Sequence, residues 1–362
     1  MASQFGERLR VSIYGESHGN GIGALIEGFP AGEQIDFERL MQFMERRQGG
    51  RNALSTARKE PVVPEFVSGI FEDKTTGFPV CIRIANTNTR SGDYNNLALK
   101  PRPSHADYSA YVKWHGHADM RGGGHFSGRL TAPVCAAGGI AIQMLERRGI
   151  YVGAHLSSIG TAQDDAFPMR PEPALFEAIA AKMFPVISDE KGAAMQQEIL
   201  AAREAMDSVG GTIECMILGL PAGLGDPMFD GIENRLARVL FGIPAVKGVE
   251  FGDGFALPEM RGSAANDPFG IDAQGNIITK TNRNGGILGG ITTGMPVRFR
   301  VGIKPTPSIA QKQQTVSLPD GNETEIEIKG RHDPCIAQRA VPVVEAAAAL
   351  TALDVLLCDG MF

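Results

Sequence analysis

The sequence has no excess of positive charge, no closely spaced cysteine pairs and no long apolar run. The formal net charge is −6, so nothing global favours nucleic acid or an anionic membrane as a partner. None of the five cysteines lies in a CxxC motif, and reduced thiols are the simplest interpretation. The N-terminal residues lack the apolar core of a signal peptide, and no stretch is both long and apolar enough to cross a bilayer. We therefore expect a cytoplasmic protein with no nucleic-acid or membrane partner.

Glycine and proline are plentiful, with 45 and 22 residues among 362. This composition implies many turns and excludes a simple helical bundle. The length corresponds to two domains or to one large domain. Because the overall charge is negative, local clusters of arginine are informative where they occur.

One polar stretch, Pro101–Arg129, concentrates chemically useful residues. Four of the seven histidines lie in it with three arginines and three consecutive glycines: His105, His115, His117, His125, Arg102, Arg121, Arg129 and Gly122–Gly124. It has neither a helical nor a strand period and is predicted to be mostly loop. Glycines let a backbone come close to a ligand, and guanidinium and imidazole groups beside them favour an anionic one. A glycine-rich turn with solvated charges is an equal alternative from this stretch alone.

Three landmarks occur twice in the same order. A strand ending in a PAG turn is followed by a helix, then by a TTGxPV hairpin, then by an alanine-rich helix behind a charged loop. The first copy comprises strands 9–14 and 22–27, the turn 28–32, a helix capped by Asp36, a hairpin of strands 62–71 and 79–86, and the helix 130–148. The second comprises the strand 215–218, the turn 219–223, the helix 230–241, the segment 292–297 and the helix 340–357.

We interpret the repeated landmarks as an internal duplication. Residues 1–362 would form one domain of two equivalent halves, about 1–150 and 208–362, joined by a helical segment at about 151–207. Helices that are apolar all round are usually buried, so the halves would pack their helices together with the sheets outside. The charged loops before both buried helices would then meet at one site. Asp333 would cap the second helix, with Pro342 in its first turn.

Seven motifs in this order and spacing resemble the chorismate synthase family over nearly the whole chain: GESHG, RRQGGR, PRPSHAD, RGGGHFSGR, NRNGGILGGITTG, KPTPS and GRHDPC. The resemblance implies an α+β fold, an internally duplicated sandwich with long buried helices between two mainly antiparallel sheets. It implies a lyase that converts 5-enolpyruvylshikimate 3-phosphate to chorismate and phosphate by anti-1,4-elimination. This is the last common step of the shikimate pathway to aromatic amino acids. It also implies a requirement for reduced FMN, assembly as a homotetramer and no metal.

The substrate carries two carboxylates and a phosphate, which guanidinium groups bind through paired donors. The resemblance implies that arginines bind these anions: Arg46, Arg47, Arg51, Arg102, Arg129, Arg331 and Arg339. Arg47 and Arg339 are neighbours of the matching positions. For Arg46 and Arg47, at the end of a helix, the helix dipole is an alternative explanation. We expect the arginines to form one anion site fed from both halves.

The catalytic residues that the resemblance implies are His18, His105, Asp333, Ser17 and Ser127. His18 would protonate the departing phosphate, which suits an imidazole because its pKa lies near working pH. His105 would stabilise the anionic reduced flavin, and Asp333 would relay the proton from flavin N5. The two serines would belong to hydrogen-bonded relays, although both could instead satisfy backbone groups of turns.

The resemblance also implies a set of flavin contacts: His125, Phe126, Ser127, Ala245, Gly286, Lys304, Thr306, Ser308 and Arg331. Where the family commonly has Arg-Ser-Ser-Ala-Arg, this chain has the sequence HFSGR at 125–129. A permanent charge is thereby replaced by the titratable ring of His125. NADPH would enter only as a source of reducing equivalents. No GxGxxG motif lies between a strand and a helix, which favours external reduction of the flavin.

Two other classes of function compete with the lyase. A metal-dependent hydrolase would be built on His115, His117, Asp119 and His125, since HxH spacing on a strand can place two imidazoles on one face. A non-catalytic anion- or flavin-binding protein would keep the binding residues without turnover. The joint presence of His18, His105 and Asp333 argues against that second class.

Overall fold

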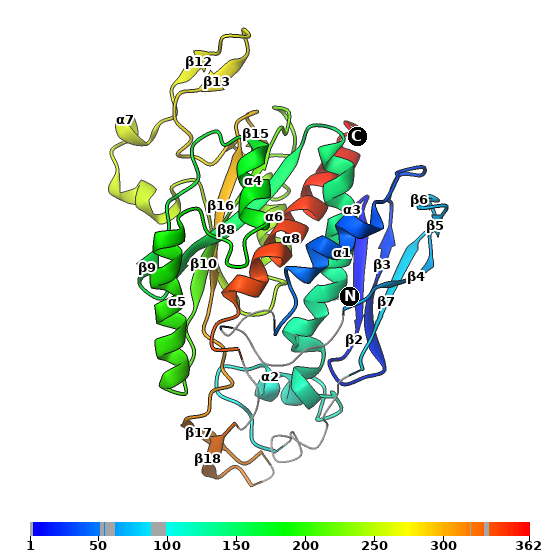
Figure 1. Cartoon of the computed structure of the whole chain (residues 1–362), viewed down its shortest axis with the longest axis vertical. Coiled ribbons are helices and arrows are strands. Elements are labelled where there is room, and N and C mark those ends of the chain that lie inside the picture. Colours follow the sequence, from blue (N-terminus) through cyan, green and yellow to red (C-terminus); the bar gives the residue numbers. More distant parts are fainter. Residues whose placement is uncertain (1–2, 51–53, 55–61, 88–98, 319, 329–332) are drawn as a thin grey trace.

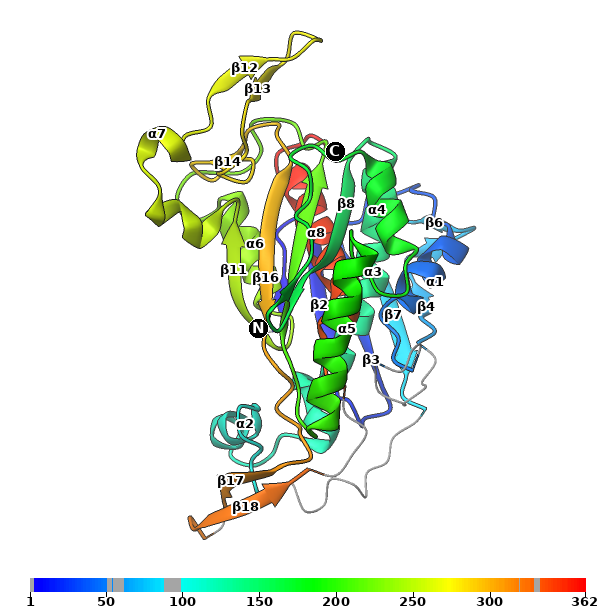
Figure 2. The ribbon, with the colours of Figure 1, turned by 60° about the vertical axis from the view of Figure 1, so that its left-hand side comes forward.

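A computed structural model of the chain describes residues 3–50, 54, 62–87, 99–318, 320–328 and 333–362. Two five-stranded antiparallel sheets lie on either side of a layer of helices (Figures 1 and 2). The first has the order β1 (Gln4–Phe5), β2 (Arg10–Gly15), β3 (Gly21–Glu27), β7 (Val80–Ala85), β4 (Glu65–Ser68). The second has the order β11 (Val246–Phe251), β16 (Val297–Ile303), β10 (Gly211–Leu218), β8 (Tyr151–Ile159), β9 (Ala162–Gln163). The predicted α+β sandwich is confirmed.

The helices are α1 (Phe37–Glu45), α2 (Asp107–Lys113), α3 (Thr131–Glu146), α4 (Pro173–Ala180), α5 (Asp189–Glu204), α6 (Ile232–Leu240), α7 (Gly262–Ala265) and α8 (Ala337–Cys358). Short 3-10 turns are η2 (Arg121–Phe126), η3 (Gly128–Leu130) and η4 (Gly254–Glu259). Two-stranded hairpins are β5–β6 (Ile70–Phe71, Lys74–Thr75), β12–β13 (Phe269–Ile271, Ile277–Thr279), β14–β15 (Ile287–Leu288, Ile291–Thr292) and β17–β18 (Lys312–Val316, Glu323–Glu327).

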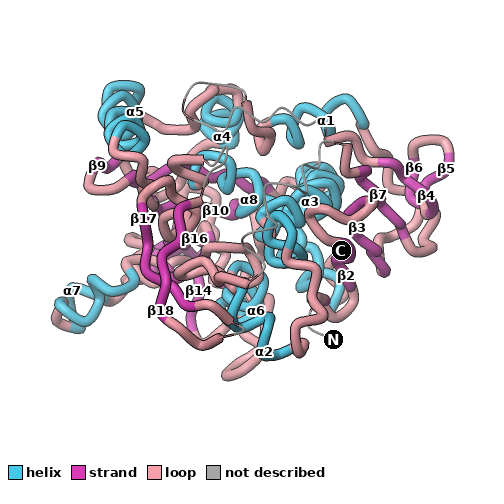
Figure 3. The backbone as a smooth tube through the Cα atoms, turned by 90° about the horizontal axis from the view of Figure 1, so that it is seen from below, coloured by secondary structure: helices cyan, strands magenta, loops and turns pink. Residues whose placement is uncertain are grey.

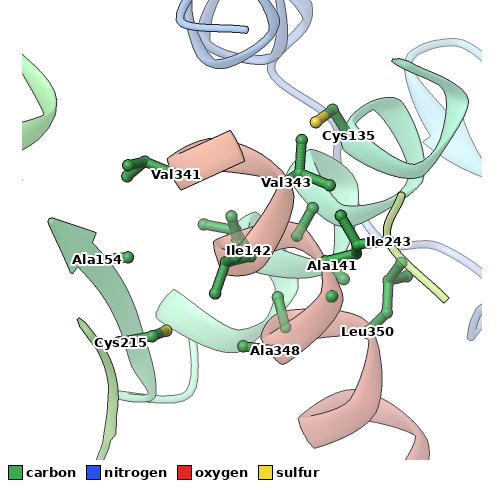
Figure 4. Close-up of a cluster of buried hydrophobic side chains, with 14 of the residues drawn as sticks. Cys135, Ala141, Ile142, Ala154, Cys215, Ile243, Val341, Val343, Ala348 and Leu350 are labelled. Atoms are coloured by element: carbon green, nitrogen blue, oxygen red, sulfur yellow. The ribbon is translucent and has the colours of Figure 1, made fainter. Parts of the chain in front are cut away.

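Helices α3 and α8 form the centre of the core. Helix α3 packs on β3 and β7, α8 packs on β8 and β10, and the two helices pack against each other. Small residues permit this close approach, because a Cβ at Gly138 would lie 2.3 Å from the Cβ of Ala346. Figure 4 shows Ala141 and Ile142 of α3 beside Val343 and Ala348 of α8. Both helices are apolar on all sides, which requires burial on all sides.

The two sheets repeat one topology, but the second half begins earlier than we expected. The order β2-β3-β7-β4 in one sheet corresponds to β8-β10-β16-β11 in the other. Helix α1 lies between β3 and β4 in sequence, as α6 lies between β10 and β11. The predicted helical connector, 151–207, opens with β8, which pairs with β10 along its length. Its helices α4 and α5 are therefore inserted between two strands of the second sheet.

His155 of β8 is buried on the face of the second sheet opposite α8. Its Nδ1 lies 3.1 Å from Asp164 Oδ2, and its Nε2 lies 3.0 Å from Glu214 Oε2. Burial lowers the pKa of His155, but these two carboxylates outweigh it and hold the pKa above its ordinary value. His155 therefore stabilises the second sheet by pairing with both carboxylates.

Helix α8 differs from its prediction in two respects. It begins at Ala337, so Pro342 lies in the second turn and not in the first. The N-cap position is held by Ile336, with no side-chain hydrogen bond to the helix. The prediction that Asp333 caps this helix is therefore wrong. Its carboxylate instead accepts a hydrogen bond from Arg339 Nη1 at 2.5 Å.

Helix α8 is also long and apolar enough to cross a bilayer by composition, contrary to our sequence-based statement that no stretch is. Most of it is buried inside the molecule, between the other helices and the second sheet. Core helices of globular domains commonly have this composition. The packing therefore accounts for its hydrophobicity.

One end of the molecule gathers segments far apart in sequence. Helix α2 and the hairpin β17–β18 lie there, at the bottom of Figure 1 and towards the viewer in Figure 3, and the N-terminal ends of α3 and α8 are directed towards them. The hairpin β17–β18 is held on the first half, since Thr315 Oγ1 donates to Pro101 O at 2.5 Å and Leu318 N donates to Leu99 O at 2.8 Å. The stretch predicted to be mostly loop thus contains α2 and is fixed by the second half.

Candidate active site

The turn between β2 and β3 presents Ser17 and His18 at this end of the molecule. Both side chains are buried, with relative exposures of 2% and 7%. Asn86 holds the turn, because its Nδ2 donates to Glu16 O at 3.0 Å and to Gly19 O at 2.9 Å. The backbone N–H of Ser17 donates to Gly124 O at 3.1 Å. The turn is therefore docked directly on the glycine run.

Neighbouring residues of the glycine run contact two imidazoles. Gly122, Gly123 and Gly124 have φ values of 61°, 92° and 53°, which favour glycine. A Cβ at Gly122 would lie 2.1 Å from Cε1 of His18. A Cβ at Gly123 would lie 3.3 Å from Nε2 of His105. The alternative of a plain solvated turn is thereby excluded, since the bare backbone is what lets both rings approach.

His105 is oriented by Asp107, a residue that the sequence analysis did not single out although it lies in the PRPSHAD motif. His105 Nδ1 lies 2.6 Å from Asp107 Oδ1, so it carries the proton of this bond and leaves Nε2 facing the glycine run. Burial raises the pKa of the Asp107 carboxyl, but hydrogen bonds from Arg102 and His105 outweigh it and hold the pKa well below its usual range. The carboxylate is therefore charged at working pH.

Arg102 is buried and committed to the same carboxylate. Its Nε and Nη2 donate to Asp107 at 2.7 Å each, and its backbone N–H donates at 2.9 Å. Nη2 also lies 3.1 Å from His105 Nδ1. In this arrangement Arg102 orients His105 through Asp107, and its fork is occupied by a side chain of the protein.

A second group of charges joins α1 to α8. Arg339 of α8 donates through Nε to Arg47 O at 3.0 Å and through Nη1 to Asp333. Arg47 is buried, and its own guanidinium donates to Thr131 Oγ1 at 2.7 Å and to Gly128 O at 2.6 Å. These bonds place guanidinium groups from both halves beside one carboxylate.

Within the described part of the chain, positive neighbours act on the buried guanidinium of Arg47. The pKa of Arg47 is lowered to about 9, mainly by burial and then by the nearby positive charges of Arg339 and Arg129, while Asp333 raises it by less. Arg129 is held at the site by Asn86 Oδ1, which accepts from its Nε at 2.6 Å. An anion bound near Arg47, Arg129 and Arg339 would be attracted by all three guanidinium groups.

Arg46 points elsewhere. Its Nη1 and Nη2 donate to the two carboxylate oxygens of Glu345 at 2.6 and 2.9 Å, and Glu345 also accepts from the backbone N–H of Ala154. This buried pair ties α1 to α8 and β8, so the structure does not bring Arg46 into the anion group. Arg51 and Arg331 lie outside the described residues.

The loop after β16 brings the second half to the same end. The backbone N–H of Lys304 donates to Ala245 O at 3.0 Å, and its Nζ donates to Ser104 O, next to His105. Thr306 Oγ1 donates to Asp333 O at 3.2 Å, and Ser308 is buried. Two of the predicted flavin contacts, Lys304 and Thr306, thus lie near His105 and Asp333, and Ala245 is hydrogen-bonded to the first of them.

Gly286 is not part of this group. A Cβ there would meet the backbone of Pro296 and Met295, at the start of β16. Lys304 follows the other end of that seven-residue strand, roughly 20 Å away. The hairpin β14–β15 beside Gly286 correspondingly lies at the end of the molecule opposite α2 (Figures 1 and 2).

The HFSGR segment has three different environments. His125 is hydrogen-bonded to Gly15 O and to Ser3 Oγ. The ring of Phe126 packs on that of Trp114 at a centroid distance of 5.8 Å. Ser127 Oγ accepts from the backbone N–H of Arg129 at 3.3 Å, as in a cap, and its Cβ also faces Gly123. Ser127 therefore does satisfy a backbone group, as the alternative interpretation proposed, and it also contacts the glycine run.

The residues of the alternative metal site do not converge. His115 and His117 are exposed, His125 is engaged as above, and Asp119 pairs with Arg121 at 2.7 Å. Within the described ranges, no group of three or more His, Cys, Asp or Glu side chains is arranged to hold a metal ion. The residues that the structure describes therefore give no support to the metal-dependent hydrolase.

Known proteins of one family resemble the chain throughout. Residues 9–357 match the chorismate synthase family. A chorismate synthase of Thermococcus gammatolerans is 48% identical, and one of Thermococcus kodakarensis is 46% identical, each over 97% of both chains. A crystal structure of a chorismate synthase superposes with a TM-score of 0.77 at 28% identity, covering 98% of this chain and 93% of that one. The chain belongs to the chorismate synthase family.

Proposed function

We propose that the chain carries out the reaction of its family at the end where the glycine run lies, with roles divided among the side chains described above. In this carbon–oxygen lyase reaction, 5-enolpyruvylshikimate 3-phosphate loses phosphate from one carbon and hydrogen from another to give chorismate. The observation that carries the proposal is that Gly122 contacts His18 and the adjacent Gly123 contacts His105. Two imidazoles thus meet a short stretch of backbone that has no side chains.

Substrate anions would bind to Arg47, Arg129 and Arg339. The support is electrostatic. The pKa of Arg47 is lowered to about 9, first by burial and then by the positive charge of Arg339. Arg129 also lowers this pKa, and the Asp333 carboxylate raises it. A dianionic phosphate or a carboxylate would relieve the repulsion between these positive charges. Because Arg339 comes from α8 and the others from the first half, substrate binding would draw on both halves.

His18 is assigned the proton that the departing phosphate takes up. It is buried beside Gly122, so water competes little for this proton. His105 is assigned to an anionic partner beside Gly123. Asp107 fixes the proton on Nδ1 of His105, which leaves Nε2 directed towards Gly123. The Asp333 carboxylate, held by Arg339, is assigned the proton-relay role that the family resemblance implies.

Residues beside His105 fit the phosphate of FMN. Burial lowers the pKa of Lys304, and the charge of Lys247 lowers it further, so an anion at this point would be favourable. Ala245, Thr306 and Ser308 lie in the same group. Reduced FMN, when bound, supplies the electron that expels phosphate and recovers it as the hydrogen leaves. NADPH would serve only to reduce the flavin.

We further propose a homotetramer in the cytoplasm. If Gly286 contacts flavin, it must do so in another copy of the chain, because β16 separates it from Lys304. The projecting hairpin next to it exposes Phe269, Ile271 and Ile277, which a partner would cover. All five cysteines are free thiols, in keeping with a reducing compartment.

A turnover assay tests the function. The purified protein should convert 5-enolpyruvylshikimate 3-phosphate anaerobically with FMN and dithionite, and should be inactive with oxidised FMN in air. Replacing dithionite by NADPH shows whether the chain reduces its own flavin. Equal turnover without flavin would contradict the assignment, and flavin binding without turnover would leave a non-catalytic flavin-binding protein.

A further inference from the structure

His125 is engaged by the protein on both sides of its ring. Nδ1 lies 2.8 Å from Gly15 O, and Nε2 lies 2.7 Å from Ser3 Oγ. A carbonyl oxygen only accepts hydrogen bonds, so Nδ1 must carry the proton. In the neutral ring Nε2 then accepts the hydroxyl proton of Ser3. Neither ring nitrogen remains for a flavin.

These two partners are themselves fixed. Ser3 precedes β1, and its carbonyl accepts from the backbone N–H of Ile13 in β2 at 2.9 Å. Gly15 is the last residue of β2 and lies two residues before Ser17. The ring of His125 is therefore held between the edge strand of the first sheet and the turn that carries His18.

Two hydrogen bonds fasten that turn to the glycine run. The backbone N–H of Ser17 donates to Gly124 O at 3.1 Å, and the neighbouring His125 donates to Gly15 O. These two bonds together set the position of Gly122 against the ring of His18. A Cβ at Gly122 would lie only 2.1 Å from Cε1 of that ring. Loss of the His125 bond would leave the Ser17–Gly124 backbone bond as the one remaining link among these described residues.

We infer that His125 is a positioning residue for the reaction. Its Nδ1–H holds the turn after β2 against the glycine run, so that His18 stays in contact with Gly122, next to the Gly123 that His105 contacts. This inference rests on the proton-donor role proposed for His18. It replaces the flavin contact that the family resemblance implied at His125.

Matched variants separate the two bonds of the ring. His125→Asn places an amide nitrogen where Nδ1 lies and keeps the bond to Gly15, but is too short to reach Ser3. His125→Gln reaches the position of Nε2 and keeps the bond to Ser3, but loses the bond to Gly15. His125→Leu loses both. Exposed His117, in the same stretch, provides the control His117→Asn.

The measurements are kcat at saturating reduced FMN, and FMN affinity from flavin fluorescence. We expect His125→Gln and His125→Leu to lose about tenfold to 10²-fold in kcat, as for a misplacement of about 1 Å. His125→Asn should keep most of the rate, and FMN affinity should change little in all three. In a His18→Ala background, His125→Leu should cause no further loss, because it acts through His18.

Other results overturn the inference. If all three variants weaken FMN binding and keep kcat, His125 is a flavin ligand. If His125→Asn is as slow as His125→Leu, the bond to Gly15 is not the one that matters. Should His125→Leu fail to fold, the kcat of His125→Asn compared with that of His125→Gln still tests whether the bond to Gly15 matters. An unchanged rate in His18→Ala alone would instead contradict the proposed role of His18.

Discussion

Gly122→Ala adds one methyl group where the glycine run meets His18. The new Cβ would lie 2.1 Å from Cε1 of the ring, so the two must separate by roughly 1.3 Å to reach ordinary contact. A misplacement of about 1 Å can cost a reaction about 10²-fold. We therefore expect kcat to fall by about two orders of magnitude, with FMN affinity little changed.

Backbone strain must be separated from this displacement. Gly122 has a φ of 61°, and a left-handed conformation costs a residue with a side chain about 1–2 kcal/mol. Gly149, after α3, has a φ of 74°, and a methyl group added there would meet nothing within 4 Å. Gly149→Ala should thus lose similar stability from strain and keep full activity.

The assay is anaerobic turnover of 5-enolpyruvylshikimate 3-phosphate with reduced FMN, combined with denaturant unfolding of both variants. If Gly122→Ala keeps the wild-type kcat while losing the same stability as Gly149→Ala, His18 is not held by the glycine run in the reacting state. The argument that Gly122 and Gly123 position His18 and His105 would then fail.

His18→Ala should slow turnover by about 10²–10⁴-fold, the usual contribution of a general acid, with FMN affinity retained in a fluorescence titration; an unchanged rate returns His18 to a structural role. Asp333→Asn keeps an oxygen for Arg339 but cannot accept a proton, so kcat should fall by orders of magnitude while the melting temperature stays near wild type. Asp333→Ala also loses the Arg339 contact and should melt lower, and a fully active Asn variant would refute the relay. The pKa of His155 is raised above its ordinary value of 6.5 by two carboxylates that outweigh burial, so its charge stabilises the fold fully below about pH 6.5 and progressively less as pH rises through the folded pKa. The loss of unfolding free energy in His155→Gln should accordingly be larger at pH 6 than at pH 9, and an equal loss at both would contradict this charge.

The apolar composition of two helices was sufficient to predict the central layer of the fold. Helices α3 and α8 are apolar all round, and such helices are stable only when buried, so their place at the centre followed from composition. The repeated landmarks likewise predicted two similar sheets outside them. The limits of the second half could not be predicted, because β8 pairs with β10 across the inserted helices α4 and α5. Strand pairing of that range leaves no signal in local periodicity.

The sequence by itself determined which chemical groups the chain carries and that they occur in the motifs of one family. Only the tertiary structure decided what each group does, because a long polar side chain takes the partner that folding brings within reach. Arg46 and Arg47 are adjacent in sequence, yet one is bound to Glu345 and the other joins the anion group with Arg339. Asp333 looked like a helix cap but pairs with a guanidinium one turn into α8. Hydrogen bonds of this kind depend on positions within a few tenths of an ångström, which only the packed core sets.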